Sequence, residues 1–70
     1  MTRQEIGYRI QGRRQSLNIK QEDLAELTGI TTRTIYAIES GIGNPSLSTL
    51  EKIADVLGLE LRIDIKKTDE

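Results

Sequence analysis

The side chains with the most specific binding chemistry in this sequence lie close together between positions 32 and 37. Arg33 carries a planar guanidinium whose donors can engage the O6 and N7 atoms of guanine together. Thr32 and Tyr36 can contact bases, thymine methyl groups or phosphates, and Ala37 can meet a thymine methyl. A helix would carry these residues on one face. We therefore predict that they read base edges in DNA. The alternative is a solvated helix face on which Tyr36 is half-buried for packing.

The stretch that contains these residues, QEDLAELTGITTRTIYAIES over 21–40, predicts two short helices joined by a tight turn. Ala25 is small enough for two backbones to approach closely, and Gly29 tolerates the positive φ that the turn needs. Leu24, Ala25 and Leu27 are expected to face inward on the first helix. The second helix, 32–40, would be locked in place by Ile30, Ile35 and Ile38, which leaves its other face free for a major groove.

Two further helices are indicated by their end signals. A Thr2/Glu5 capping box begins a helix over about 3–17, in which Gly7 and Gly12 are weak helix formers and Asn18 marks the end. Ser46 is expected to cap the last helix, and Gly58 to end it. The apolar residues of that last helix are Leu47, Leu50, Ile53, Ala54 and Leu57.

After Gly58 the apolar period changes from 3.6 to 2, which predicts a strand over 59–67 with one buried face. The residues on that face are Leu59, Leu61, Ile63 and Ile65. A lone strand leaves its backbone groups unpaired, so we expect it to pair with the same strand of a second copy. Antiparallel pairing about Ile63 sets Arg62 opposite Asp64 and Glu60 opposite Lys66. The alternative is an edge strand that folds against its own helices or stays disordered.

Composition excludes several other classes of function. The 70 residues contain no Cys and no His, which removes disulfides, imidazole bases and nearly all zinc sites. The remaining carboxylates and hydroxyls form no catalytic pattern, so we expect neither an enzyme nor a cofactor. No membrane span or signal peptide is indicated, which fits a cytoplasmic protein. The net charge is −1, with six basic and five acidic residues in 1–45, so few phosphate contacts are expected.

The sequence resembles the Cro/repressor (XRE) helix-turn-helix family over about residues 5–58. Besides 21–40, the likeness rests on Glu39-Ser40-Gly41 with Asn44-Pro45-Ser46-Leu47-Ser48-Thr49-Leu50, and on Ile53-Ala54-Asp55-Val56-Leu57-Gly58. The family implies a mainly α, lambda-repressor-like domain that binds operator DNA.

The resemblance also implies roles for residues outside the base-reading face. Gln21 would hydrogen-bond a phosphate at the start of its helix. Arg14 would form a partly buried ion pair with Glu39 that fixes the recognition helix. The other candidate phosphate contacts are Lys20, Thr34, Ser40, Asn44 and Arg13, of which Arg13 is expected to stay exposed. Lys20 stands where relatives often have Ser or Asn, which puts that helix cap in doubt.

The predicted order of four helices followed by one strand is similar to that of the HipB-type antitoxin-repressors, which act with a HipA-type kinase toxin. We therefore expect a helix-turn-helix domain over 1–58, a dimerisation strand over 59–67 and a tail over 68–70. The leading hypothesis is a homodimeric repressor that autoregulates a toxin–antitoxin operon. A protein-interaction module that neutralises a toxin, or a stand-alone phage-type repressor, remains open.

Overall fold

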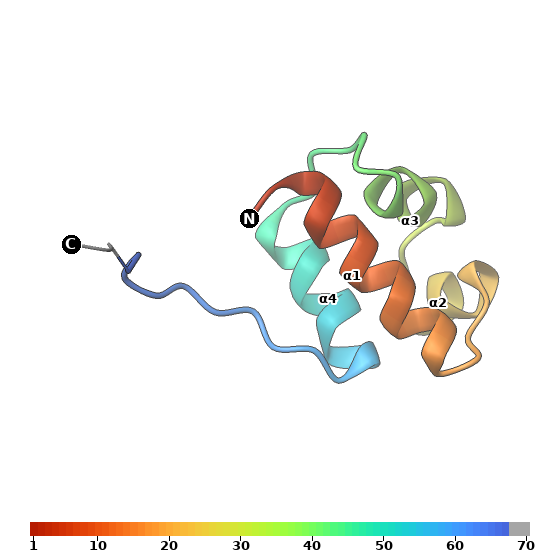
Figure 1. The fold of residues 1–70 in the computed structure, drawn as a ribbon. Coiled ribbons are helices and arrows are strands. Elements are labelled where there is room, and N and C mark those ends of the chain that lie inside the picture. The colour runs from red at the N-terminus through yellow and green to blue at the C-terminus, as the bar shows by residue number, and fades with distance from the viewer. Residues whose placement is uncertain (68–70) are drawn as a thin grey trace.

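The computed structural model describes residues 1–67, which form four helices followed by an extended arm (Figure 1). The helices are α1 (Arg3–Ser16), α2 (Gln21–Thr28), α3 (Thr32–Glu39) and α4 (Leu47–Leu57). The mainly α architecture of four short helices is therefore confirmed. The predicted tail over 68–70 lies outside the described residues. None of the described helices is long and apolar enough to cross a membrane.

The helix ends follow the local signals in the sequence. The Glu5 amide donates to the Thr2 hydroxyl at 3.1 Å, and the Thr2 amide donates back to the Glu5 carboxylate at 3.3 Å. Gly29 adopts a left-handed φ of 73° after α2, as the tight turn requires. The helix predicted over 32–40 ends one residue earlier, because Ser40 is its C-terminal cap.

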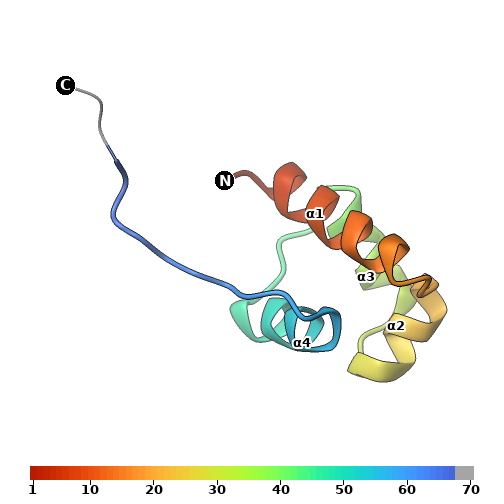
Figure 2. The ribbon, with the colours of Figure 1, turned by 60° about the horizontal axis from the view of Figure 1, so that its bottom comes forward.

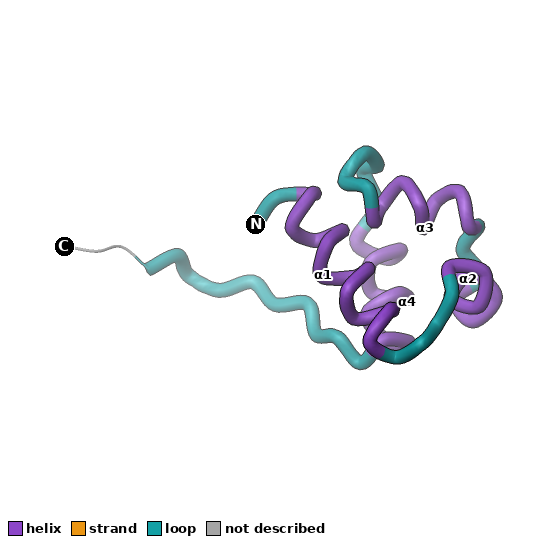
Figure 3. The backbone as a smooth tube through the Cα atoms, turned by 45° about the vertical axis from the view of Figure 1, so that its right-hand side comes forward, coloured by secondary structure: helices purple, strands orange, loops and turns teal. Residues whose placement is uncertain are grey.

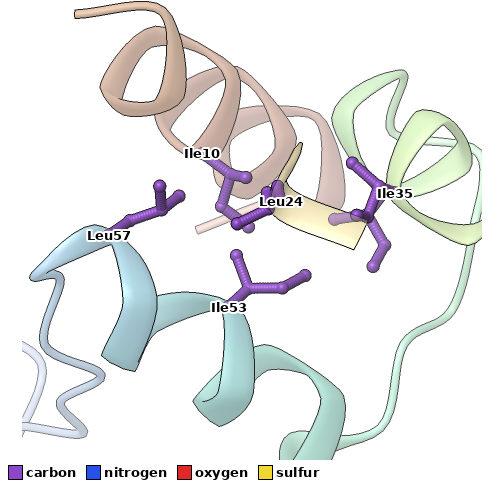
Figure 4. Close-up of a cluster of buried hydrophobic side chains, with 6 residues drawn as sticks. Ile10, Leu24, Ile35, Ile53 and Leu57 are labelled. Atoms are coloured by element: carbon purple, nitrogen blue, oxygen red, sulfur yellow. The ribbon is translucent and has the colours of Figure 1, made fainter. Parts of the chain in front are cut away.

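One apolar cluster joins the four helices, and its side chains point toward one another in Figure 4. Its buried members are Ile10, Leu24, Ile35, Ile38, Ile53 and Leu57. The expectation for Leu27 was wrong, since this residue is 62% exposed. The buried face of α2 is centred between Leu24 and Ala25, and 100° per residue turns Leu27 away from it.

The backbones of α1 and α3 approach each other closely where Gly7 of α1 meets the end of α3. A Cβ atom at Gly7 would collide with the carbonyl oxygen of Ile38 and lie 2.8 Å from that of Glu39. Only glycine therefore lets α1 lie this close to α3. The sequence had suggested Ala25 for such an approach, and Ala25 is partly buried against the core.

A buried ion pair joins the same two helices about two turns further along α1. The Arg14 Nε and Nη2 atoms donate to the two carboxylate oxygens of Glu39 at 2.7 and 2.9 Å. Both residues are only 8% exposed, so the predicted pair is confirmed and is more deeply buried than expected. Arg14 Nη1 also donates to the Ile19 carbonyl at 2.8 Å, which ties the turn before α2 to the pair.

The Arg14 guanidinium stays charged in this position. The hydrogen bonds to Glu39 raise the pKa of Arg14 above its ordinary value; burial acts in the opposite direction, and the negative charge of Glu39 raises the pKa further. No buried side-chain nitrogen or oxygen of the described residues lacks a hydrogen-bond partner. The pair is therefore fully satisfied, which is the condition under which a buried charge is tolerated.

Arg13, the neighbour of Arg14, turns toward α4. It is exposed, as expected, but its Nε atom donates to the Leu57 carbonyl at 2.8 Å. This bond satisfies one of the carbonyls left free at the end of α4. The Arg13 side chain is therefore engaged at the end of α4, and we do not propose it as a phosphate contact.

Residues 59–67 leave α4 as an extended arm with no strand assigned within the described chain (Figure 3). Leu59 packs against the core, whereas Ile63 and Ile65 are 97% and 95% exposed. Arg62 lies 3.5 Å from the Glu60 carboxylate and 3.9 Å from that of Asp64, which places these charges on one side of the arm. The predicted strand thus has an extended backbone, and its pairing remains a prediction.

The two helical glycines of α1 provide a matched test of the α1–α3 contact. We expect Gly7→Ala to destabilise the fold by about 2 kcal/mol or more, since the new methyl group meets backbone carbonyls that cannot move independently. Gly12→Ala should stabilise it by about 0.5–1 kcal/mol, because open space surrounds Gly12 and alanine favours the helix. Urea unfolding followed by circular dichroism measures both. Equal shifts in the two variants would contradict the contact.

Two adjacent arginines test the buried ion pair in the same way. Arg14→Ala should lower the free energy of unfolding by about 3–5 kcal/mol, because it leaves Glu39 buried without its counter-charge. Arg13→Ala removes the same side chain from the next position but breaks only one partly exposed hydrogen bond, worth about 0.5–1.5 kcal/mol. If Arg14→Ala unfolded at the same urea concentration as the wild type, the structural role of the pair would be wrong.

Candidate nucleic-acid interface

Helix α3 is buried on one side and free on the other. Ile35 and Ile38 face the core, while Thr32, Arg33 and Tyr36 are exposed, Tyr36 by 59%. In Figure 1 the helix lies at the edge of the bundle. Within residues 1–67 no hydrogen bond or ion pair engages the Arg33 guanidinium, so its donors are available to a ligand.

The exposed start of α3 is fixed by its cap. The Thr34 amide donates to the Thr31 hydroxyl at 3.2 Å, and the two hydroxyls lie 3.0 Å apart. This satisfies one of the free amides of the first turn and gives that turn a defined direction. Thr34, a candidate phosphate contact, is exposed and already shares a hydrogen bond with the cap.

A shallow hollow separates α3 from the loop that leads to α4. Arg33, Thr34, Ala37 and Asn44 all line it, so two base-reading candidates and two phosphate candidates lie together. Ala37 is only partly exposed because the loop covers it, and its carbonyl accepts the amides of Ile42 and Gly43. Of the four base-reading candidates, Ala37 therefore has the least room to meet a thymine methyl group.

The start of α2 lies beside the end of α3 through a shared carboxylate. The Gln21 Nε2 atom donates to Glu39 Oε1 at 3.0 Å, and Gln21 thereby joins the ion pair of Arg14. Because an amide nitrogen carries two protons, one remains for a phosphate oxygen. The sequence had assigned separate roles to Gln21 and Glu39, and no local signal indicated that they touch.

The cap of α2 differs from those of the other helices. Lys20 has no side-chain acceptor, so only the reverse half of a capping box forms, in which the Lys20 amide donates to Asp23 at 3.2 Å. The Lys20 side chain is exposed and available, as is that of Ser40 at the other end of α3. The doubt about this cap is therefore confirmed, and a cation stands beside the free amides of α2.

The α3–α4 loop is held against the start of α1 by contacts that the sequence reasoning missed. Gly41 has a φ of 72°, and a Cβ there would lie 2.9 Å from Gln4 Cγ. The Arg3 guanidinium reaches the Gly43 carbonyl at 3.5 Å. The glycine after Glu39-Ser40 was the available signal for such a close approach. These contacts fix the position of Asn44 relative to α3.

Comparison with known proteins places this arrangement in a family. A helix-turn-helix family model of the XRE type matches residues 10–63, most of the chain. The chain is 44% identical over 61 residues to a protein of Methanothermobacter thermautotrophicus named an uncharacterized HTH-type transcriptional regulator, covering 87% of this chain and 88% of that protein. A similarly named protein of Methanocaldococcus jannaschii is 44% identical over 54 residues, 76% of this chain and 82% of its own length.

A repressor protein from a phage is also similar to this chain in sequence. The immunity repressor protein of Bacillus phage phi105 is 38% identical over 56 residues, which cover 80% of this chain and 39% of that longer protein. The shared region contains both helices of the predicted motif and the loop that follows them. This chain therefore belongs to the XRE-type helix-turn-helix family of DNA-binding transcription regulators.

Proposed function

We propose that this chain acts as a dimeric, sequence-specific repressor that inserts one α3 from each subunit into successive major grooves of operator DNA. The two half-sites would be related by two-fold symmetry and lie about one helical turn apart. Arg33, Thr32 and Tyr36 would contact base edges, with a smaller contribution from Ala37. Gln21 and Lys20 would hold phosphates at the start of α2, and Thr34, Asn44 and Ser40 would do so around α3.

The observation that carries this proposal is the free N-terminal turn of α3. The opposite face of the helix is buried, and its C-terminal turn is held by Gly7 and Arg14, so its first turn is rigid without being covered. Arg33 lies on that turn with an unengaged guanidinium. An exposed arginine near the start of a well-anchored helix is suited to bidentate recognition of guanine. Repression is supported by the similarity to a phage immunity repressor.

The arm supports the dimeric part of the proposal. Ile63 and Ile65 are almost fully exposed in the single chain, and two extended arms could bury these side chains together. Antiparallel pairing about Ile63 would also satisfy the unpaired backbone and set opposite charges across the two strands.

The exposed arm also favours a second candidate, a protein-interaction role as an antitoxin against a HipA-type kinase toxin. The two activities separate experimentally, since α3 and the arm lie on different elements. Arg33→Ala should weaken operator binding strongly and leave any complex with a co-purified toxin intact. Loss of both together would contradict this division of the molecule.

The DNA-binding proposal is tested by selecting binding sites from a random duplex library and then measuring affinity for the selected site. We expect a two-fold symmetric sequence that contains a guanine in each half-site. Arg33→Ala should weaken binding to it by about thirtyfold or more, because one bidentate contact is worth about 1–3 kcal/mol and occurs twice in the dimer.

Lys52→Ala is the matched control for charge. Lys52 is exposed on α4, so this variant loses one positive charge without altering α3. Its affinity for the selected site should stay within about twofold of the wild type at equal salt. Equal losses of affinity in the two variants would mean that Arg33 contributes only charge. A random library from which no sequence is enriched would overturn the proposal.

The register of the arms is tested by exchanging charges. Arg62→Asp would place two carboxylates opposite each other twice in the dimer, and we expect the dimer dissociation constant to rise about tenfold. Adding Asp64→Arg restores opposite charges and should recover most of the loss. Sedimentation equilibrium measures both constants. If the double variant associated no better than Arg62→Asp, the strands would not pair about Ile63.

A further inference from the structure

An apolar groove runs between the arm and the helices beneath it. Its walls are the starts of α1 and α4, from which Met1, Ile6, Leu47 and Leu50 contribute. The arm closes its other side, with Leu61 among the lining residues. Figure 2 shows the arm leaving α4 and passing the N-terminal side of the molecule.

The chain fills this groove only in part. Leu47 is 64% exposed and Met1 is also exposed, although both lie beside the partly buried Ile6 and Leu50. Leu61 is the last arm residue with substantial burial, at 44% exposure. Ile65 lies four residues further on, about 13 Å along an extended chain, so it cannot fold back beside Leu61 without breaking the arm. An apolar side chain that covered Leu47 would therefore have to come from another chain.

The proposed pairing of the arms supplies such a side chain. With the two arms antiparallel about Ile63, Leu61 of one copy lies directly opposite Ile65 of the second copy. Directly opposed residues of an antiparallel pair point to the same face. Leu61 is the most buried of the arm residues that line the groove of its own subunit, so the face that carries Leu61 is the one that covers the groove, and Ile65 of the second copy would lie on that face as well.

We propose that Ile65 of a second copy of this chain occupies the groove lined by Met1, Ile6, Leu47 and Leu50. This inference rests on the proposed dimer and names the contact that joins each arm to the helices of the other subunit. The charges agree with it, because Arg62 lies within ion-pair reach of both Glu60 and Asp64, which places these three residues on one face of the arm. Glu60 and Arg62 also line the groove, but their side chains are 77% and 69% exposed and therefore remain largely in solvent. The arms would then be attached to both domains, and the dimer would be more than a two-stranded ribbon.

A double-mutant cycle on the full chain tests this contact. The variants are Leu47→Ala, Ile65→Ala and the pair, and the measurement is the dimer dissociation constant by sedimentation equilibrium. Each single change should raise the constant about tenfold or more, because each removes two buried apolar contacts per dimer. The dissociation constant of the double variant should exceed that of the wild type by clearly less than the product of the two single fold-changes, because both substitutions remove the same contact.

Leu27→Ala is the control for Leu47→Ala, because Leu27 is the same residue type with nearly the same exposure, 62% against 64%, and lies on α2 away from the groove. Leu27→Ala should leave the dimer dissociation constant unchanged. Combined with Ile65→Ala, it should raise that constant no further than Ile65→Ala does alone. If the wild type dimerised but Leu47 and Ile65 also acted independently, the groove contact would be wrong and the dimer would stand. If the wild type were monomeric at all accessible concentrations, both the dimer and this contact would be overturned. The proposed role of α3 would still be tested separately by the selection of DNA sites.

Discussion

The orientation of α3 depends on how closely α1 approaches its last turn. Gly7 brings the backbone of α1 against the carbonyls of Ile38 and Glu39, a distance that no other residue would permit. At this distance Arg14 reaches Glu39 with two parallel hydrogen bonds. The glycine contact sets the separation of the helices, and the planar fork of the arginine sets their rotation. Both act on the C-terminal turn of α3, which is why its N-terminal turn can project without support.

The Arg14–Glu39 pair is better understood as a device for geometry than as a source of net stability. Moving two charges out of water costs several kcal/mol per ion, and their attraction repays that cost only when every hydrogen bond is made. Here Glu39 accepts from both Arg14 and Gln21, while Arg14 also holds the Ile19 carbonyl. One carboxylate therefore links the end of α3 to the start of α2. The groups proposed to read bases and to hold phosphate are positioned by the same network.

The sequence predicted best those features that local chemistry decides. Helix ends depend on a cap or a glycine within a few residues, and the capping box at Thr2 and the turn at Gly29 were found where expected. Burial depends on how a helix is rotated against its neighbours, so Leu27 was placed on the wrong side of α2. Gly7 looked like a weak helix former because the carbonyls that require it are more than 30 residues away in the sequence. The arm is a second example. The alternation of apolar and polar residues predicts an extended backbone, but whether that backbone forms a strand depends on a partner that the sequence of one chain does not reveal.

The distribution of charge explains why a single domain would bind DNA weakly. Of the basic residues in 1–45, Arg13 and Arg14 are engaged by α4 and Glu39, and Arg3 contacts the α3–α4 loop. Arg9 is exposed on α1, and Lys20 and Arg33 are the cations left beside the start of α2 and on α3, so each subunit can neutralise few phosphates. Joining two domains makes the second contact intramolecular and raises its effective concentration without adding charge. A short, stiff connection does this best, because a long flexible one would let the second domain search a larger volume. An arm that pairs with its counterpart and is also anchored in the other subunit's groove would meet that requirement within nine residues, 59–67.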